Sequence, residues 1–364
     1  MKVGIMSMQR IKNYGSFLQA YGLKKILESF GNEVVFVDYQ FQDELVTTPI
    51  IKKSIITKFK NNINIYKFIQ KKMYINKFDN KFVKEYIPQL CGEKYNYLDK
   101  TIDSLVIGSD EVFNCLQSYP VGYSKELFGE HYEDKNVISY AASFGQTNIE
   151  RLKKFRIDQE IASLLRKFKN ISVRDLNSFN TIERLINKEP SINLDPVLVY
   201  DYKNDLIDKV IIKDYILLYT YPERLNNTEK NMIKTFAKKH KKKIVNIGVY
   251  CDIANINIIV HPLEVMSYFE HADFIITDTF HGSIFSIKTH SKFCAIVRTG
   301  NCGNINKLYD LLKRLKKEEV ILNDITELEK MYNNNVNYAE TDKIIEEERK
   351  KTFDYLKNNI TDGN

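Results

Sequence analysis

The alternation of strand-like and helix-like segments constrains this fold more than any other feature. Short apolar runs alternate with amphipathic stretches long enough for helices, which favours parallel strands joined by right-handed crossovers. In the first 200 residues the predicted strands are Val3–Met8, Glu33–Tyr39, Ser104–Ile107, Val137–Ala142 and Ile171–Val173. Further on they are Tyr215–Thr220, Lys243–Gly248, Asp273–Thr277 and Lys292–Val297.

Helical periodicity fills most of the intervals between these strands. The predicted helices are Ser16–Phe30, Ile149–Phe168, Leu176–Ile186, Thr228–His240, Leu263–Glu270, Gly282–His290 and Asn304–Leu315. A chain of 364 residues is long enough for two domains with separate cores. We predict two α/β domains, 1–200 and 201–335, joined by a linker at 199–213 and followed by a C-terminal helix within 336–364. Ligands are expected in the cleft where the strands end.

One basic segment interrupts the first domain. Residues 43–100 are rich in Lys, Asn, Ile and Phe and are predicted to be a helical insert. Residues 51–84 hold ten lysines and one acidic residue, so the rest of this +7 chain sums to −2, and no general nucleic-acid surface is predicted. A basic amphipathic helix can lie on an anionic membrane. The alternative is a solvated helical subdomain packed on the first domain.

The composition argues against a membrane protein, a secreted protein and a metalloprotein. The longest apolar runs are strand-sized and Met1–Ser7 is too quickly polar for a signal peptide, so neither a membrane span nor an export signal is expected. Five cysteines without a C-x-x-C pair and six scattered histidines favour a cytoplasmic protein with reduced thiols and no metal site. No cofactor is predicted.

The segment 275–286 carries the strongest chemical signal. An apolar strand ends at Thr277, and Thr279, His281, Gly282 and Ser283 follow in a turn that starts a helix. Helix N-termini favour anions and His is the common proton donor near neutral pH, so this turn suits transfer of a phosphorylated or carboxylated group. Asp273 or Asp278 could orient the imidazole or merely cap a helix.

Four further strand ends carry polar side chains. The first turn contains Arg10, Asn13, Gly15 and Ser16, which favour an anion, although a single glycine makes a dinucleotide fingerprint weak. The alternative is an ordinary capped turn.

Asp110 follows a buried strand and is placed to act as a base, or to cap a following helix. Arg174 also ends a strand and could bind a carboxylate or phosphate, or pair with Asp175 or Asp195. Arg298 is a further anion-binding candidate at a strand end.

Taken together, these segments resemble the polysaccharide pyruvyl transferase family. The resemblance is strongest at 13–21, 106–114 and 277–286, with weaker similarity at 139–145, 172–175 and Asp195-Pro196. It implies two Rossmann-like domains arranged as in GT-B glycosyltransferases. It also implies transfer of the enolpyruvyl unit of phosphoenolpyruvate to a sugar of a cell-surface polysaccharide precursor, forming a pyruvate ketal.

The resemblance also suggests roles for the candidate residues. His281 would be the proton donor and Asp110 the base, while Arg10, Asn13, Gly15, Ser16, Arg174, Thr279, Gly282, Ser283 and Arg298 would bind the donor. The acceptor would be a glycan or a lipid-linked saccharide. The resemblance does not cover residues 51–84, but their basic character could bring the enzyme to a membrane that holds such an acceptor. Thr279 stands where several family branches have arginine, which keeps open a glycosyltransferase that uses a nucleotide sugar. The basic insert keeps open a non-catalytic, membrane-associated role in glycan assembly.

Overall fold

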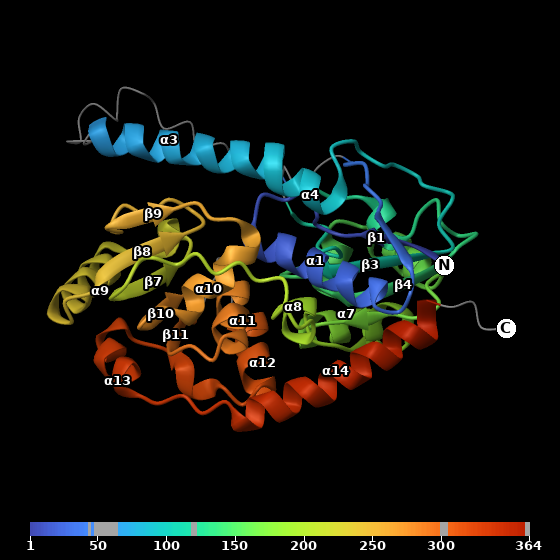
Figure 1. Ribbon diagram of the computed structural model, residues 1–364. Helices are drawn as coiled ribbons and strands as arrows, with labels where there is room; N and C mark the ends of the chain where they lie inside the picture. The colour runs from blue at the N-terminus through green and yellow to red at the C-terminus, as the bar shows by residue number, and fades with distance from the viewer. Residues whose placement is uncertain (43–44, 47–64, 118–121, 299–304, 361–364) are drawn as a thin grey trace.

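Two parallel sheets organise the molecule (Figure 1). The computed structural model describes residues 1–42, 45–46, 65–117, 122–298 and 305–360. The first sheet has the order β2-β1-β3-β4-β5-β6, with β1 Lys2–Met6, β2 Glu33–Phe36, β3 Ser104–Asp110, β4 Asn136–Ala142, β5 Ser172–Val173 and β6 Ser191–Ile192. The second has the order β12-β11-β10-β7-β8-β9, with β7 Tyr215–Tyr219, β8 Lys243–Ile247, β9 Ile256–Ile258, β10 Phe274–Thr277, β11 Phe293–Ile296 and β12 Ile321–Leu322.

Helices cover both sheets. The first half has α1 Tyr14–Glu28, α5 Ile149–Lys154, α6 Asp158–Leu165, α7 Leu176–Ile186 and α8 Pro196–Val199. The second has α9 Asn227–Lys239, α10 Val265–Glu270, α11 Phe280–Lys288, α12 Ile305–Arg314 and α13 Leu328–Asn333. Central strands covered on both faces are apolar throughout, and β7 (YILLY) is buried along its whole length. The predicted fold class, two Rossmann-like α/β units, is confirmed, while the domain boundaries stay a prediction.

The single helix predicted over Ile149–Phe168 is wrong. It is two helices, α5 and α6, separated by a turn in which Arg156 has a left-handed φ of 58°. Helices commonly end at a left-handed residue that is usually glycine, so an arginine there gave no stop signal. The short strands β6, β9 and β12 were not predicted, because two or three residues show no measurable periodicity.

Residues 65–91 of the basic insert are helical, as α3 Ile65–Lys81, the π-helix η1 Phe82–Tyr86 and α4 Ile87–Cys91. Its described residues 45–46 and 92–100 form no helix, and its residues 43–44 and 47–64 lie outside the described part of the chain. Tyr74 and Phe78 of α3 stack at 6.4 Å. The Tyr74 hydroxyl lies 3.0 Å from the Gly248 carbonyl and 2.9 Å from that of Ile258, so α3 packs beside β8 and β9 of the second half (Figure 1). The predicted subdomain therefore contacts both halves.

Within the described residues, and apart from the insert, the chain crosses between the halves twice. The first crossing is the predicted linker, which forms no helix or strand between the end of α8 and the start of β7. The second crossing leads into α14, Ala339–Ile360, which runs from the second half to the first (Figure 1). Near its start, Thr341 donates a hydrogen bond to the Leu315 carbonyl, and near its end Tyr355 donates one to the Ser139 carbonyl. This helix ties the two halves together.

Candidate active site

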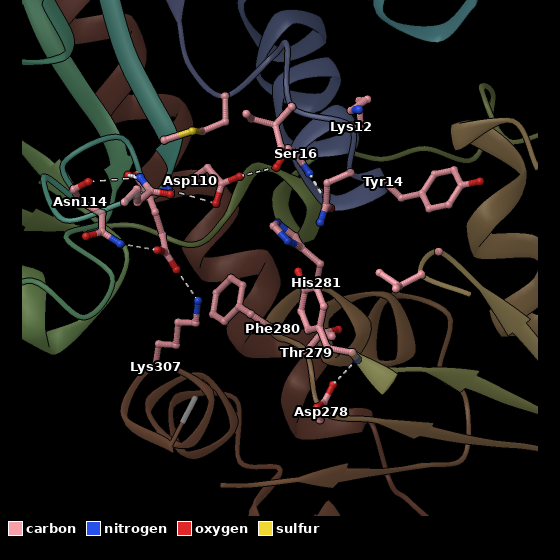
Figure 2. A pocket seen from close by; sticks show the side chains of 18 of the residues that line it. Lys12, Tyr14, Ser16, Asp110, Asn114, Asp278, Thr279, Phe280, His281 and Lys307 are labelled. Carbon is pink, nitrogen blue, oxygen red and sulfur yellow. Dashed lines mark hydrogen bonds and ion pairs between the residues drawn. The ribbon is translucent and has the colours of Figure 1, made fainter. Parts of the chain in front are cut away.

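A cavity of about 460 Å³ lies where the strands of both sheets end (Figure 2). Its walls come from segments that follow β1, β3, β4 and β5 in the first half and β7, β8 and β10 in the second. Open α/β sheets bind ligands at these carboxyl ends, so the cavity is in the predicted position.

His281 projects into this cavity from the first turn of α11 (Figure 2). Thr279 is the N-cap residue, and its hydroxyl accepts the Gly282 N–H at 2.9 Å. The imidazole packs against α1 at Gly15, where an added Cβ would lie only 2.2 Å from Nδ1. Gly15 is therefore needed because the histidine ring packs against it. The sequence pattern predicted that an anion would lie against this glycine.

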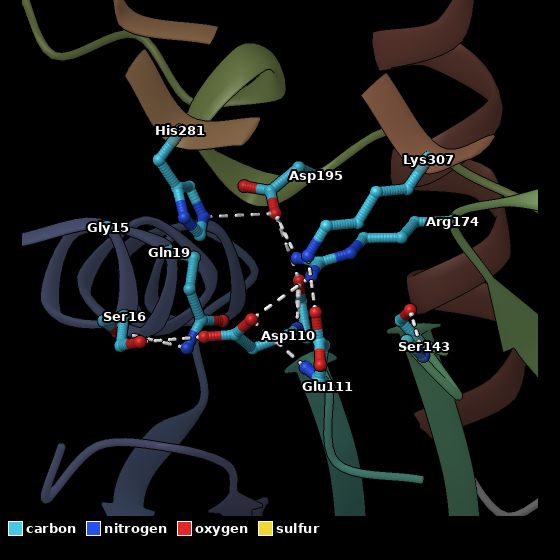
Figure 3. A network of polar contacts seen from close by, with 12 residues as sticks. Gly15, Ser16, Gln19, Asp110, Glu111, Ser143, Arg174, Asp195, His281 and Lys307 are labelled. Atoms are coloured by element: carbon cyan, nitrogen blue, oxygen red, sulfur yellow. Dashed lines mark hydrogen bonds and ion pairs between the residues drawn. The ribbon is translucent and has the colours of Figure 1, made fainter. Parts of the chain in front are cut away.

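A polar network connects the imidazole to the first sheet (Figure 3). His281 Nε2 lies 3.6 Å from Asp195 Oδ2, which accepts a hydrogen bond from Arg174 at 2.8 Å. The same guanidinium donates to Asp110 Oδ1 at 3.0 Å, and Ser16 donates to Asp110 Oδ2 at 2.7 Å. Imidazole, two carboxylates and one guanidinium thus form a continuous chain of contacts.

The two carboxylates of this network are ionised. Burial opposes ionisation of Asp195, but contact with His281 and Arg174 outweighs it and lowers the pKa to about 2. Burial likewise opposes ionisation of Asp110, but Arg174 and His281 lower its pKa below the usual value. Burial disfavours the charged form of Arg174, but Asp110 and Asp195 raise its pKa. Arg174 is therefore a counter-ion for two carboxylates, as the pairing interpretation with Asp195 predicted.

A second ion pair crosses the cavity. Lys307 on α12 binds Glu111, which also accepts a hydrogen bond from Asn114 at 2.8 Å. Burial opposes ionisation of Glu111, but Lys307 lowers its pKa. The Phe280 ring lies 4.6 Å from the Arg174 guanidinium and 5.9 Å from the Lys307 ammonium, so one aromatic ring contacts both cations.

The structure brings some of the predicted site residues together and leaves others apart. Those lining the cavity are His281, Asp110, Asn13, Ser16, Arg174 and Thr279. Gly15 lies beside it under the imidazole, whereas Gly282 and Ser283 bond within α11. The predicted anion cradles already have partners, because Asn13 accepts the N–H groups of Gly15 and Ser16 and Thr279 accepts that of Gly282.

Two predicted anion-binding arginines do not line the cavity. Arg10 pairs with Asp38 at 2.8 Å and stacks on Tyr95. Arg298 donates to Glu229 at 3.0 Å and lines a separate depression of about 270 Å³. Each arginine is held by a carboxylate that is distant in the sequence, and the position of an arginine at a strand end does not show which carboxylate will bind it.

The predicted orienting carboxylates are also elsewhere. Asp273 pairs with Lys242 at 2.8 Å, and Asp278 accepts the Tyr221 N–H at 3.1 Å, so the carboxylate that faces His281 is Asp195. No helix directly follows Asp110, which excludes the capping interpretation.

Sequence reasoning missed several cavity residues, namely Glu111, Arg151, Tyr221, Arg224 and Lys307. Glu111 lies inside the 106–114 motif without having been given a role there, and the others carry no local signal because they come from helices and turns that the fold brings together.

Within the described residues, no three His, Cys, Asp or Glu side chains gather as a metal site. No described helix combines the length and apolar character needed to cross a bilayer.

Comparison with solved structures supports the two-domain arrangement. A UDP-GlcNAc 2-epimerase from Methanocaldococcus jannaschii is 13% identical with a TM-score of 0.50, covering 94% of this chain and 95% of that one. A Listeria monocytogenes protein assigned as a UDP-N-acetylglucosamine 2-epimerase is 11% identical with a TM-score of 0.51, covering 94% and 90%. At these identities the likeness concerns the fold alone. The comparison with curated proteins gave no match.

Two Rossmann-like units with a charged cavity between them form a GT-B-like fold. The family model for polysaccharide pyruvyl transferase matches residues 13–299, which is most of the chain. The chain therefore belongs to the polysaccharide pyruvyl transferase family.

Proposed function

We propose that this protein transfers the enolpyruvyl unit of phosphoenolpyruvate to two hydroxyls of a sugar in a cell-surface polysaccharide precursor. The products are a cyclic pyruvate ketal and phosphate. Family membership supports the reaction class. The observation that carries the proposal is one cavity holding an imidazole and an ionised carboxylate, His281 and Asp110, linked through Arg174 and Asp195.

The reaction needs one proton donor and one base. The His281 imidazolium gives its proton to the donor methylene, which becomes a methyl group and leaves an oxocarbenium-like carbon. The first sugar hydroxyl adds to that carbon and its proton passes to Asp110. The carbon–oxygen bond to phosphate then breaks, and the second hydroxyl adds. The Asp110 proton leaves with phosphate, and the proton of the second hydroxyl restores the imidazolium.

The test measures phosphate release from phosphoenolpyruvate with a panel of sugars that carry neighbouring hydroxyls. His281→Gln should lower turnover about 10²–10⁴-fold, the usual contribution of a positioned acid. His271→Gln is the matched control, because His271 is partly exposed, lies outside the cavity and should leave turnover unchanged. Wild-type turnover by the His281 variant would disprove its role as the acid.

A glycosyltransferase that uses a nucleotide sugar is the second candidate. Thr279 favours it, because the residue beside the cavity histidine is an uncharged capping side chain and not a cation. Stabilisation of the protein by a nucleoside diphosphate, but not by phosphoenolpyruvate, in thermal unfolding would support this candidate over the first.

The face of α3 favours a lipid-linked acceptor and peripheral contact with the inner face of the membrane. Exposed apolar side chains lie among exposed lysines on α3 and on the η1 turn that follows it: Phe68, Ile69 and Met73 with Lys72 and Lys77 on α3, and Val83 with Lys84 on η1. This pattern suits an anionic lipid surface. Phe78 of the same helix lines the cavity, so a bound membrane would lie near the site.

Met73→Glu should weaken sedimentation with phosphatidylserine-containing vesicles, and added salt should weaken that of the wild type. Ile211→Glu, at a residue 87% exposed in the linker, is the control. Equal sedimentation of all three proteins would remove the membrane role, including the non-catalytic one.

A further inference from the structure

Most of the basic side chains in the cavity wall are already neutralised. Arg174 contacts Asp110 and Asp195, Lys307 contacts Glu111, and Lys12 lies 2.8 Å from Asp79. An anion that bound to any of these groups would have to compete with a carboxylate in place. Two lining arginines remain to be considered.

Arg151 lacks such a partner. It lies on α5, and in the described part of the chain no carboxylate oxygen comes within 4.0 Å of its guanidinium. Its Nη1 donates to the Gln146 carbonyl at 3.2 Å, which uses one of its five N–H groups. Most of the donor capacity of this side chain is left for another acceptor.

Arg224 has no carboxylate within hydrogen-bond distance in the described part of the chain. Its Nη1 lies 4.0 Å from Asp278 Oδ2, which is beyond hydrogen-bond length, and the Arg224 side chain is 31% exposed. The same Asp278 oxygen lies 3.7 Å from Arg298 Nε, so this carboxylate is shared between two guanidiniums. The Arg224 guanidinium carbon lies 4.3 Å from the centre of the Tyr221 ring, a cation–π contact that does not use the N–H groups as hydrogen-bond donors.

The two arginines come from opposite halves of the protein. Arg151 follows β4 and Arg224 follows β7, so each lies near the carboxyl edge of its own sheet and both line the same cavity. Thr220 lies in that wall beside Tyr221, and its buried hydroxyl has no hydrogen-bond partner among the described residues. Buried polar groups are normally bonded, which points to a ligand or solvent oxygen at this wall.

We propose that Arg151 and Arg224 form the subsite that binds the phosphate group of the donor. The proposal rests on the proposed function for the identity of the donor, phosphoenolpyruvate. The two guanidiniums offer planar, paired donors to the phosphate oxygens. When the carbon–oxygen bond breaks, these charges stabilise the departing phosphate. The same chemistry would hold the diphosphate of a nucleotide sugar.

The test measures dissociation constants by calorimetry for phosphoenolpyruvate, inorganic phosphate and uridine diphosphate. Arg151→Ala and Arg224→Ala should each weaken binding of the phosphate-bearing ligand about ten- to hundred-fold, the scale of a lost charge-assisted contact. Arg224→Lys, which keeps the charge without the paired donors, should fall between wild type and Arg224→Ala. Arg166→Ala, at an exposed position outside the cavity, should bind like wild type.

The outcomes separate this subsite from the proposed function. If phosphoenolpyruvate supports turnover while Arg151→Ala and Arg224→Ala keep wild-type affinity, the subsite is wrong and the function stands. If the wild type binds uridine diphosphate but not phosphoenolpyruvate, and both variants lose that binding, the subsite stands and the proposed donor is wrong. Failure of the wild type to bind any of the three ligands would overturn the subsite.

Discussion

Gly15 offers the sharpest test of the site, because one added methyl group would displace the imidazole. A Cβ at this position would lie 2.2 Å from His281 Nδ1 and 2.3 Å from Cγ, whereas contacts of a real Cβ are essentially never shorter than 3.0 Å. The ring must therefore withdraw by about 1 Å. A misplacement of that size can cost roughly 10²-fold in rate.

The effect of Gly15→Ala on stability should be much smaller than its effect on rate. Gly15 lies in the first turn of α1, where alanine gains up to about 1 kcal/mol in helix propensity over glycine. Overpacking costs about 1–3 kcal/mol, so the net loss should lie between zero and about 2 kcal/mol. We expect a melting temperature within several degrees of wild type.

Gly22→Ala in the same helix is the matched control. A Cβ there would lie 2.6 Å from the Tyr202 hydroxyl, a comparable overlap away from the cavity. Phosphate release should fall about 100-fold in Gly15→Ala and stay near wild type in Gly22→Ala. Equal turnover in the two variants would refute the claim that Gly15 positions His281.

Three further predictions concern buried charges. Arg174→Ala should lower the free energy of unfolding by about 3–5 kcal/mol in urea titrations, because it strands two buried carboxylates; a loss below about 1 kcal/mol would contradict that pairing. The pKa of Asp195 is lowered from 3.8 to about 2, so its ionisation should contribute about 2 kcal/mol to the free energy of unfolding. This contribution is present above pH 4 and is lost as pH falls towards 2. Asp195→Asn should therefore flatten this acid loss, and an unchanged acid profile would argue against it. Burial raises the pKa of Asp278, so this group has the opposite sign: wild-type stability falls as pH rises from below 3.8 through the folded-state pKa. Asp278→Asn should therefore raise the melting temperature relative to wild type more at pH 7 than at pH 3, and an equal difference at both pH values would contradict the assignment.

The sequence predicted the parts of the fold that depend on local pattern. Buried runs such as β7 and amphipathic stretches such as α7 lie within a residue or two of their predicted positions. The break between α5 and α6 was missed, because a left-handed arginine replaces the usual glycine signal. Short edge strands were missed because their pairing depends on neighbours far along the chain.

The site shows the same division. Asp110 ends a buried strand and His281 lies in the turn that follows one, and the ends of strands in a parallel sheet converge, so both were identified. Arg10 and Arg298 had equally good local positions, yet Asp38 and Glu229 bind them elsewhere. An arginine can bind a ligand anion only where no nearby carboxylate already accepts its N–H groups. The positions of those carboxylates are a property of the folded structure.

Helix α14 has a consequence for how the chain folds. It satisfies polar groups of the first sheet made over 200 residues earlier: Ser104 donates to the Ile360 carbonyl, and Asn136 donates to that of Asn359. The first α/β unit therefore lacks these contacts until residues 339–360 have been synthesised and docked. Non-local closure of this kind slows folding and exposes intermediates. Refolding should thus be slower than the local βα pattern of the first half would suggest, with the docking of α14 as a late step.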